Sequence, residues 1–356
     1  MPAGPSFHVT NEVPDHLHRS LNDRLSGQDH GSSRIDNHAG EYARLDRVGQ
    51  VFAHDPVAGH YHHMKPAPFD YHAPTSIAEA VAVLGEVGAE GKVLAGGQSL
   101  LPILSMRLAS PAHLVDINRI SELAFVRVEN DGVRVGALAR HAELERHGGA
   151  RAAVPLIGQG LRLVAHPVIR NRGTTVGSIA HADPAGEMTA VLALLGGTVE
   201  LTGAGGSRTA AAVDFFLGPL ESDVRPGELV TSVFFPAPAG GTGTAFVEVS
   251  RRHGDYAICG LAAAVRLSAD GVVVSARAAY LSVGPVPVVL DLTDAVAGEE
   301  AAGTEWAAAG ALAAGRVDPE ADIHASADYR RHLVGVLTAR GLAAAAANAV
   351  PVEVAV

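Results

Sequence analysis

The stretch VLAGGQSLLP, residues 93–102, decides how the first part of this chain folds. Val93 and Leu94 favour a buried β-strand, Gly96-Gly97 interrupts it, and a new apolar segment begins at Leu100. Such an interruption is either an ordinary tight turn or a place where the backbone is left bare for a ligand, because glycine has no Cβ. The stretch by itself is compatible with both.

The neighbouring residues predict a small β-α-β unit around this turn. Residues 74–88 predict a helix in which Ser76 is the N-cap, Glu79 completes a capping box and Gly88 stops the helix. We expect a second strand in HLVDI, residues 113–117. Residues 124–138 predict a hairpin that turns at Asp131-Gly132 and is added to this unit.

The rest of the chain predicts further mixed segments. Helical spacing runs over residues 154–164 and ends at His166-Pro167, a polar turn is expected over 170–178, and a helix over 187–195. Residues 198–213 predict a hairpin and 228–236 a closing strand. From about Thr244 two long strands are expected around SADG (268–271), followed by alanine-rich helices. The predicted fold class is therefore α+β.

Composition excludes several classes of function. With 356 residues, the chain is longer than one compact core usually organises. A net charge of −11 argues against nucleic acid as the main partner. No apolar run suits a transmembrane helix and no secretion signal is recognisable, so a cytoplasmic location is expected. Cys259 is the only cysteine, which excludes an internal disulfide and any multi-thiolate metal site built by this chain alone.

Residues 1–63 differ from the rest of the sequence. They hold nine of the 18 histidines and show no sustained periodicity, so we expect a disordered, histidine-rich N-terminal extension. A metal-binding tract through His60, His62 and His63 is the alternative, but no carboxylate pattern accompanies these histidines. We therefore predict no metal ligands in the chain.

Two turns of glycine and small polar residues, 95–99 and 173–178, carry the candidate chemistry. The chain shows no Rossmann fingerprint, P-loop, H-E-x-x-H or G-x-S-x-G motif. Successive N–H groups in glycine turns can converge on phosphate oxygens, and the hydroxyls of Ser99, Thr174 and Ser178 add short donors. Each turn could equally be a plain connection, and the pattern does not name the ligand.

Three segments resemble one known family. KVLAGGQSLLPILSMRLASPAHLVDINRI (92–120) closely resembles the first flavin-binding segment of the FAD-containing medium subunits of molybdenum hydroxylases, such as carbon monoxide dehydrogenase and xanthine dehydrogenase. Residues 166–195 resemble the second segment, R-G-T-x-G-G-S/N-x-x-H-A-D-P, and residues 322–342 resemble the C-terminal end. The resemblance covers about residues 64–345.

The resemblance implies a fold with three parts. Residues 64–150 and 151–240 would be the two subdomains of a PCMH-type (vanillyl-alcohol-oxidase-like) FAD-binding domain. Residues 241–356 would be a C-terminal α+β domain of the carbon monoxide dehydrogenase flavoprotein type.

The resemblance also implies FAD-binding residues, position by position. The first turn would wrap the FAD pyrophosphate, the second would close on it from the other side, a third group would lie near the ribityl or isoalloxazine end, and an aromatic ring would cover one face of the flavin. The first turn consists of Ala95, Gly96, Gly97, Gln98 and Ser99, with Val93, Leu94 and Leu100 beside the cofactor. The second turn contributes Thr174, Gly177 and Ser178, and Ala165 and Ile169 line the pocket. The group near the ribityl or isoalloxazine end is His181, Asp183 and Glu187, and the aromatic ring belongs to Tyr256, which follows Asp255.

Taken without the resemblance, some of these residues have simpler interpretations. Tyr256 could be a core aromatic, His181 a buried histidine, and Asp183-Pro184 the turn that starts a helix. Cys259 is expected to be a small buried hydrophobe. Val176 stands where the family usually has glycine. Valine would be strained at positive φ and harmless otherwise, and we favour the harmless case.

The resemblance implies an oxidoreductase subunit that carries FAD and no catalytic acid or base of its own. Substrate would be oxidised in a large molybdopterin subunit, and electrons would pass through a small [2Fe-2S] subunit to the FAD and on to an external acceptor, in a dimer of heterotrimers. Two alternatives remain open at this stage: a self-sufficient flavin oxidase of the same fold, and a scaffold that has lost the cofactor.

Overall fold

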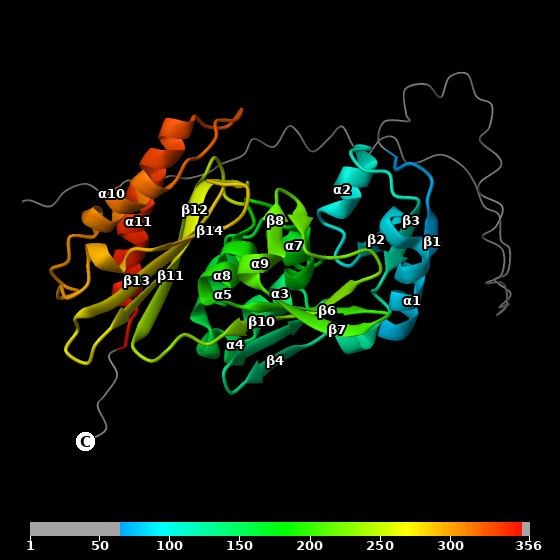
Figure 1. Cartoon of the computed structure of the whole chain (residues 1–356), viewed down its shortest axis with the longest axis horizontal. Helices are drawn as coiled ribbons and strands as arrows, with labels where there is room; N and C mark the ends of the chain where they lie inside the picture. Colours follow the sequence, from blue (N-terminus) through cyan, green and yellow to red (C-terminus); the bar gives the residue numbers. More distant parts are fainter. Residues whose placement is uncertain (1–64, 351–356) are drawn as a thin grey trace, which may run out of the picture. The chain divides into compact units, whose positions relative to one another are not determined.

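The computed structural model describes residues 65–350. The N-terminal extension predicted at 1–63, with its histidine tract, lies outside the described residues. In the described part, helices and strands are mixed along the chain, and the strands form sheets of three, five, four and two strands (Figure 1). This arrangement confirms the predicted α+β fold class.

The first sheet is parallel, with the order β1-β3-β2, and it confirms the predicted β-α-β unit. Its connecting helix begins after Ser76, whose hydroxyl accepts a hydrogen bond from the Glu79 N–H at 3.2 Å, and it ends at Gly88. The Glu79 carboxylate reaches back to the backbone N–H of Thr75 and not to that of Ser76. The elements are β1 (Asp70–His72), α1 (Ile77–Val87), β2 (Gly91–Leu94), α2 (Leu100–Ser105) and β3 (His113–Asp116).

The second sheet is antiparallel, with the order β4-β5-β10-β6-β7. The hairpin expected as an addition to the first unit belongs to this sheet instead, because Val135 pairs with Val233 of β10. Val133 and Val135 are fully buried in one hydrophobic core with Val199 and Val233, so burial of their apolar face favours a place in the five-stranded sheet. The strands are β4 (Val126–Glu129), β5 (Gly132–Gly136), β6 (Thr198–Gly203), β7 (Gly206–Ala211) and β10 (Leu229–Pro236).

Short helices accompany the second sheet. Prolines 155 and 167 stand in the first turn of α5 and α6, where a missing N–H costs nothing. The polar turn expected over 170–178 is only partly a turn, because Thr174 caps a helix that begins at Thr175. The remaining elements are α3 (His141–Arg146), α4 (Gly148–Ala153), α5 (Pro155–Leu161), α6 (Pro167–Arg170), α7 (Thr175–His181), α8 (Glu187–Leu195), α9 (Ala212–Phe215), β8 (Phe216–Gly218) and β9 (Glu221–Ser222).

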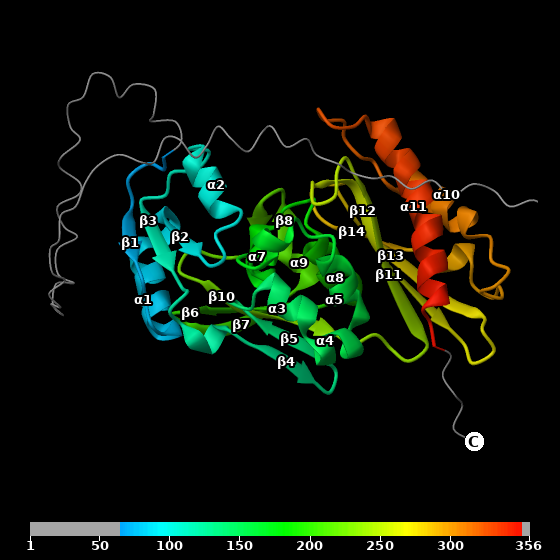
Figure 2. The ribbon, with the colours of Figure 1, turned by 180° about the vertical axis from the view of Figure 1, so that it is seen from behind.

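The third sheet has one more long strand than the sequence predicted. Strand β11 (Thr242–Ser250) pairs antiparallel with β12 (Ala257–Leu267), and β13 (Val273–Leu281) and β14 (Val288–Asp291) follow. One face of the sheet is covered by α11 (Ala327–Ala347), and α8 packs on the other face (Figures 1 and 2). Because β12 is buried on both faces, it reads as a nearly continuous apolar run.

Helix α10 (Trp306–Arg316) approaches α11 through glycine. A Cβ atom placed on Gly310 would lie 2.4 Å from the carbonyl oxygen of Gly335. A larger residue at position 310 would therefore push the two helices apart and weaken their packing. By contrast, a Cβ on Gly315 of the same helix would meet no atom within 4 Å.

We therefore predict opposite effects for two alanine substitutions on one helix. Gly310→Ala should lower the free energy of unfolding by about 1–3 kcal/mol through overpacking. Gly315→Ala, the matched control, should raise it by about 0.5–1 kcal/mol because alanine favours the helix. Urea titrations followed by circular dichroism measure both, and equal effects would contradict the close helix contact.

Candidate functional site

The two glycine turns meet in the folded chain. A Cβ atom on Gly96 would lie 2.6 Å from the carbonyl oxygen of Arg172, 2.7 Å from Cα of Gly173 and 2.9 Å from N of Thr174. No side chain fits between the two backbones. Gly97 adopts φ +73°, a left-handed conformation that favours glycine. The two adjacent glycines are therefore needed for different reasons, close approach and backbone conformation.

The first turn is accessible. Every residue of 93–100 is partly exposed, so the expectation of a buried strand before the turn is wrong, since β2 lies at the edge of its sheet. The Gln98 amide folds back to donate to the Gly96 carbonyl at 3.3 Å. Ser99 makes no side-chain capping bond at the start of α2, which leaves its hydroxyl for another partner.

The second turn is held by its own hydrogen bond. The Thr174 hydroxyl oxygen accepts from the Gly177 N–H at 3.1 Å, which leaves the hydroxyl hydrogen free to donate elsewhere. Val176 is helical and 1% exposed, and it is not among the residues with positive φ. The structure thus agrees with the interpretation that valine is harmless at this position.

His141 supports the second turn from behind. Its backbone N–H donates to the Gly173 carbonyl at 2.9 Å, and its Nδ1 lies 3.1 Å from the Thr175 hydroxyl. Burial, together with the positive charge of Arg170, lowers its pKa to about 4, so the ring is neutral at pH 7. Sequence reasoning missed His141, because a lone histidine after a hairpin carries no recognisable signal.

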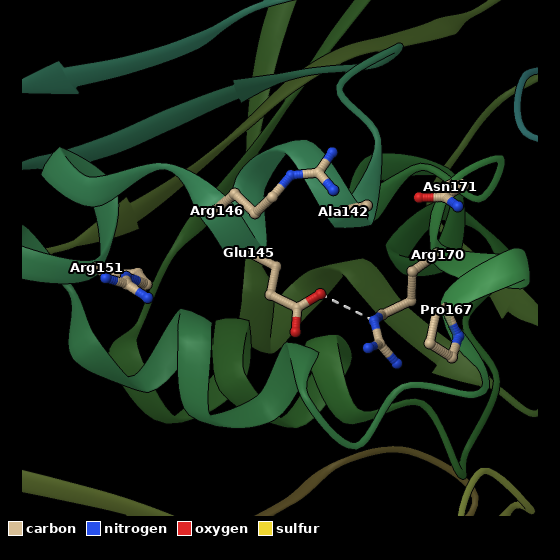
Figure 3. Close-up of a pocket in the computed structure, with 7 residues that line it drawn as sticks. All are labelled: Ala142, Glu145, Arg146, Arg151, Pro167, Arg170 and Asn171. Atoms are coloured by element: carbon tan, nitrogen blue, oxygen red, sulfur yellow. Dashed lines mark hydrogen bonds and ion pairs between the residues drawn. The ribbon is translucent and has the colours of Figure 1, made fainter.

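A cavity of about 410 Å³ lies beside this turn (Figure 3). The Arg170 guanidinium donates through Nε to Glu145 at 2.9 Å, and through Nη1 to the carbonyls of Val164 and Ala165 at 2.9 and 3.2 Å. These bonds hold Ala165 at φ +43°, ahead of Ile169 on α6. The cavity is lined by Ala142, Glu145, Arg146, Arg151, Pro167, Arg170 and Asn171, so it contains none of the predicted flavin-binding residues.

The third predicted group follows the same helix. His181 is the last residue of α7, which ends because Ala182 adopts φ +52°. Asp183 then accepts a hydrogen bond from the Ala185 N–H at 2.9 Å, and Glu187 begins α8. All three side chains are partly buried, so His181 is not the fully buried core histidine of the simpler interpretation.

Tertiary structure brings Tyr256 to this group. Its ring is 70% exposed, which contradicts the interpretation as a core aromatic. Loss of hydration at the hydroxyl, followed by the negative charges of the nearby Asp183 and Glu187, raises the pKa of Tyr256. Asp255 is exposed, and its N–H donates to the Arg252 carbonyl at 3.1 Å. Within residues 65–350, no side-chain hydrogen bond links Asp255 to the other predicted residues.

A second carboxyl group, missed by the sequence reasoning, lies near Glu187. Glu248 on β11 pairs with Gly260 of β12, and its Oε2 is buried without a hydrogen-bond partner in the described part of the chain. Burial raises the pKa of Glu248 to about 7. Burial, followed by the charges of Glu248 and Asp183, raises the pKa of Glu187 to about 8. The signal was a lone acid in an apolar strand.

Arg330 connects these segments through the C-terminal domain. Arg330 is only 6% exposed. Its guanidinium donates to the carbonyls of Ile258 and Ser282 at 2.6 and 2.7 Å, and to the Asp322 carboxylate at 2.6 Å. The N–H of Ser282 in turn donates to the Pro184 carbonyl at 2.9 Å. The segment that resembles the family's C-terminal end therefore holds both the turn after α7 and the strand that follows the exposed tyrosine.

Comparison with known proteins identifies the family of the chain. Residues 67–238 match the FAD binding domain in molybdopterin dehydrogenase, and residues 244–345 match the CO dehydrogenase flavoprotein C-terminal domain. The carbon monoxide dehydrogenase medium chain of Hydrogenophaga pseudoflava is 38% identical over 283 residues, which cover 79% of this chain and 98% of that one. The chain belongs to the FAD-binding medium subunits of the molybdenum hydroxylase family, a family of oxidoreductases.

Other relatives show the range of this family. Subunit alpha of the 6-hydroxypseudooxynicotine dehydrogenase complex of Paenarthrobacter nicotinovorans is 38% identical over 291 residues, covering 82% of this chain and 98% of that one. The structure of carbon monoxide dehydrogenase from H. pseudoflava matches with a TM-score of 0.76 at 38% identity, covering 81% of this chain and 100% of that one. Among residues 65–350, no helix is long and apolar enough to cross a membrane.

The raised pKa of Glu248 predicts a pH dependence of stability. The folded state holds a proton that the unfolded state releases between about pH 4.5 and pH 7, so this group lowers stability as the pH rises through that window. Glu248→Gln should raise the free energy of unfolding by about 1–2 kcal/mol at pH 8 and change it little at pH 5, after allowance for partial solvent screening.

Urea unfolding at the two pH values measures this difference. Glu86→Gln, an exposed glutamate on α1, is the matched control and should behave like the parent protein at both. If Glu248→Gln shifted stability equally at pH 5 and pH 8, the buried-carboxyl interpretation would be wrong.

Proposed function

We propose that this chain is the FAD-carrying electron-transfer subunit of a molybdenum hydroxylase, which passes electrons from iron–sulfur clusters of a partner to an external acceptor. The observation that carries the proposal is the contact between the two glycine turns at Gly96 and Gly173. Tyr256 lies near Asp183 and Glu187, which follow the second turn in the sequence. Membership of the medium-subunit family supports it.

The residues of the first turn fit a dinucleotide diphosphate. Gly96 and Gly97 are both partly exposed, and a Cβ atom at Gly96 would collide with the backbone of the second turn. The hydroxyls of Ser99, Thr174 and Ser178 would add short donors from the two turns. FAD is therefore the cofactor that we assign to this site, with Ala95–Ser99 on one side of the diphosphate and Thr174, Gly177 and Ser178 on the other.

The remaining predicted residues would surround the rest of the cofactor. Val93, Leu94, Leu100, Ala165 and Ile169 would line its pocket, and His181, Asp183, Glu187 and Asp255 would lie toward the ribityl or isoalloxazine end. When bound, FAD supplies a group that stores two electrons and exchanges them singly. The exposed ring of Tyr256 would cover one face of the flavin and exclude water from it.

The carboxyl group of Glu187 is a protonated acid in this site. With a pKa of about 8, its carboxyl group is mostly protonated at pH 7 and can donate a hydrogen bond through its O–H. A neutral acid next to Asp183 avoids placing two negative charges side by side. The sequence had offered no acid or base in this chain, and Glu187 is the group whose protonation could respond to charge at the flavin.

The iron–sulfur clusters must belong to a partner. Cys259 is fully buried, and burial raises the pKa of its thiol to about 12, so it is not available as a thiolate ligand. Relatives named as a medium chain or as a subunit of a dehydrogenase complex support assembly with other chains. We propose a large molybdopterin subunit and a small [2Fe-2S] subunit as these partners, in a dimer of heterotrimers; a cytoplasmic location stays a prediction.

Removal of two hydroxyls should weaken FAD binding. Ser99→Ala combined with Ser178→Ala should raise the Kd for FAD, each lost charge-assisted hydrogen bond costing about 1.5–3 kcal/mol. Titration of the FAD-free protein, followed by flavin fluorescence, measures this. Ser207→Ala on the exposed β6–β7 hairpin is the control. A parent protein that takes up no FAD would refute the proposed function, and an unchanged double variant would refute the diphosphate assignment.

Reduction of the flavin distinguishes a subunit from a self-sufficient oxidase. We expect that alcohols, amines and N-heterocycles do not bleach the FAD absorption of the isolated chain under anaerobic conditions. Reduction of the same flavin should appear only when the large and small subunits are present. Bleaching of the isolated chain by any of these substrates would favour the oxidase alternative.

A further inference from the structure

A chain of side-chain hydrogen bonds joins the two glycine turns outside their backbone contact. Arg140 donates through Nη1 to the carbonyl of Arg172, next to Gly173, at 2.6 Å. Through Nη2 it donates to Oδ1 of Asn118 at 2.7 Å. Asn118 in turn donates through Nδ2 to the carbonyl of Ala95, in the first turn, at 2.8 Å. One guanidinium group and one amide thus span the site.

Both ends of this bridge are fixed in place. Asp116 accepts hydrogen bonds from the N–H and the Nδ2 of Asn118 at 2.9 and 2.6 Å, and from the Tyr71 hydroxyl at 2.5 Å. These bonds orient the Asn118 amide so that its oxygen faces Arg140. The backbone of Arg140 forms an isolated antiparallel bridge with Thr174 of the second turn.

The positive charge of the Arg140 guanidinium is only partly balanced by its neighbours. Within residues 65–350 it makes no ion pair, and Arg172 adds a second positive charge beside it. Burial and the charge of Arg172 lower the pKa of Arg140, while Glu143 and Asp116 act in the opposite direction. A group of two negative charges bound against the outer side of the two turns would relieve this repulsion.

We propose that Arg140, acting through Asn118, is a positioning residue that sets the separation of the two turns for the FAD diphosphate. The planar guanidinium can donate to two acceptors in fixed directions, which a lysine ammonium on a flexible stem cannot reproduce. The inference rests on the proposed function and adds a part of the site that neither glycine motif contains.

A double-mutant cycle tests the bridge. Arg140→Lys and Asn118→Ala should each weaken FAD binding by about 10-fold, because each breaks the same chain of charge-assisted hydrogen bonds. The double variant should also lose about 10-fold and not 100-fold, because the second change removes nothing further. Arg146→Lys, an exposed arginine on α3 with no side-chain hydrogen bond within residues 65–350, is the matched control and should bind FAD like the parent.

Two readouts separate positioning from a general effect on folding. The Kd for FAD is measured by fluorescence titration, and the urea midpoint of the FAD-free protein is measured in parallel. Positioning predicts a weaker Kd with a midpoint close to that of the Arg146→Lys control. A midpoint that falls in proportion to the loss of FAD affinity would overturn the proposal, as would additive losses in the double variant. If Arg140→Lys does not fold, Asn118→Ala alone decides by the same criteria.

The outcomes also separate this inference from the proposed function. A parent protein that takes up no FAD would refute the proposed function itself. A parent that binds FAD, together with Arg140→Lys and Asn118→Ala variants that bind it equally well, would refute only the role of Arg140.

Discussion

The close approach of Gly96 to the backbone of Arg172–Thr174 is the constraint on which the site depends. Two segments far apart in the sequence come within van der Waals distance, and they can do so only because neither presents a side chain there. Hydrogen bonds to the second turn support that contact: the N–H of His141 donates to the Gly173 carbonyl, and Arg140 donates to the Arg172 carbonyl. The packing of the two turns and the proposed binding of FAD therefore depend on the same few atoms.

The C-terminal domain completes the site and does not stand apart from it. Strand β12 shares its apolar face with α8, so the loop before it is delivered next to the turn that ends α7. Arg330 fixes this arrangement by bonding both to the strand and to Ser282, which holds Pro184. A buried arginine with carbonyl and carboxylate partners is costly to remove, because its charge would lose several hydrogen bonds at once.

Local signals explain which elements could be predicted. The capped helix α1, the helix α8 over 187–195 and the hairpin over 198–213 each carry their own pattern, so they were identified correctly. The incorrect predictions concern elements whose structure depends on contacts with other segments. The hairpin at 126–136 joined the second sheet, and the polar turn became a helix from Thr175, because cross-strand pairing and a single threonine cap outweighed local polarity.

The sequence by itself determined the two glycine turns, their order and, through resemblance, the family and its cofactor. Glycine pairs can be recognised in a sequence as special backbone positions, because few backbone conformations require glycine. Tertiary structure alone decided that the turns touch, that Arg140 and Asn118 bridge them, and that Glu248 lies near Glu187. Hydrogen bonds and charge interactions of this kind depend on distances between remote residues, and no local pattern encodes those distances.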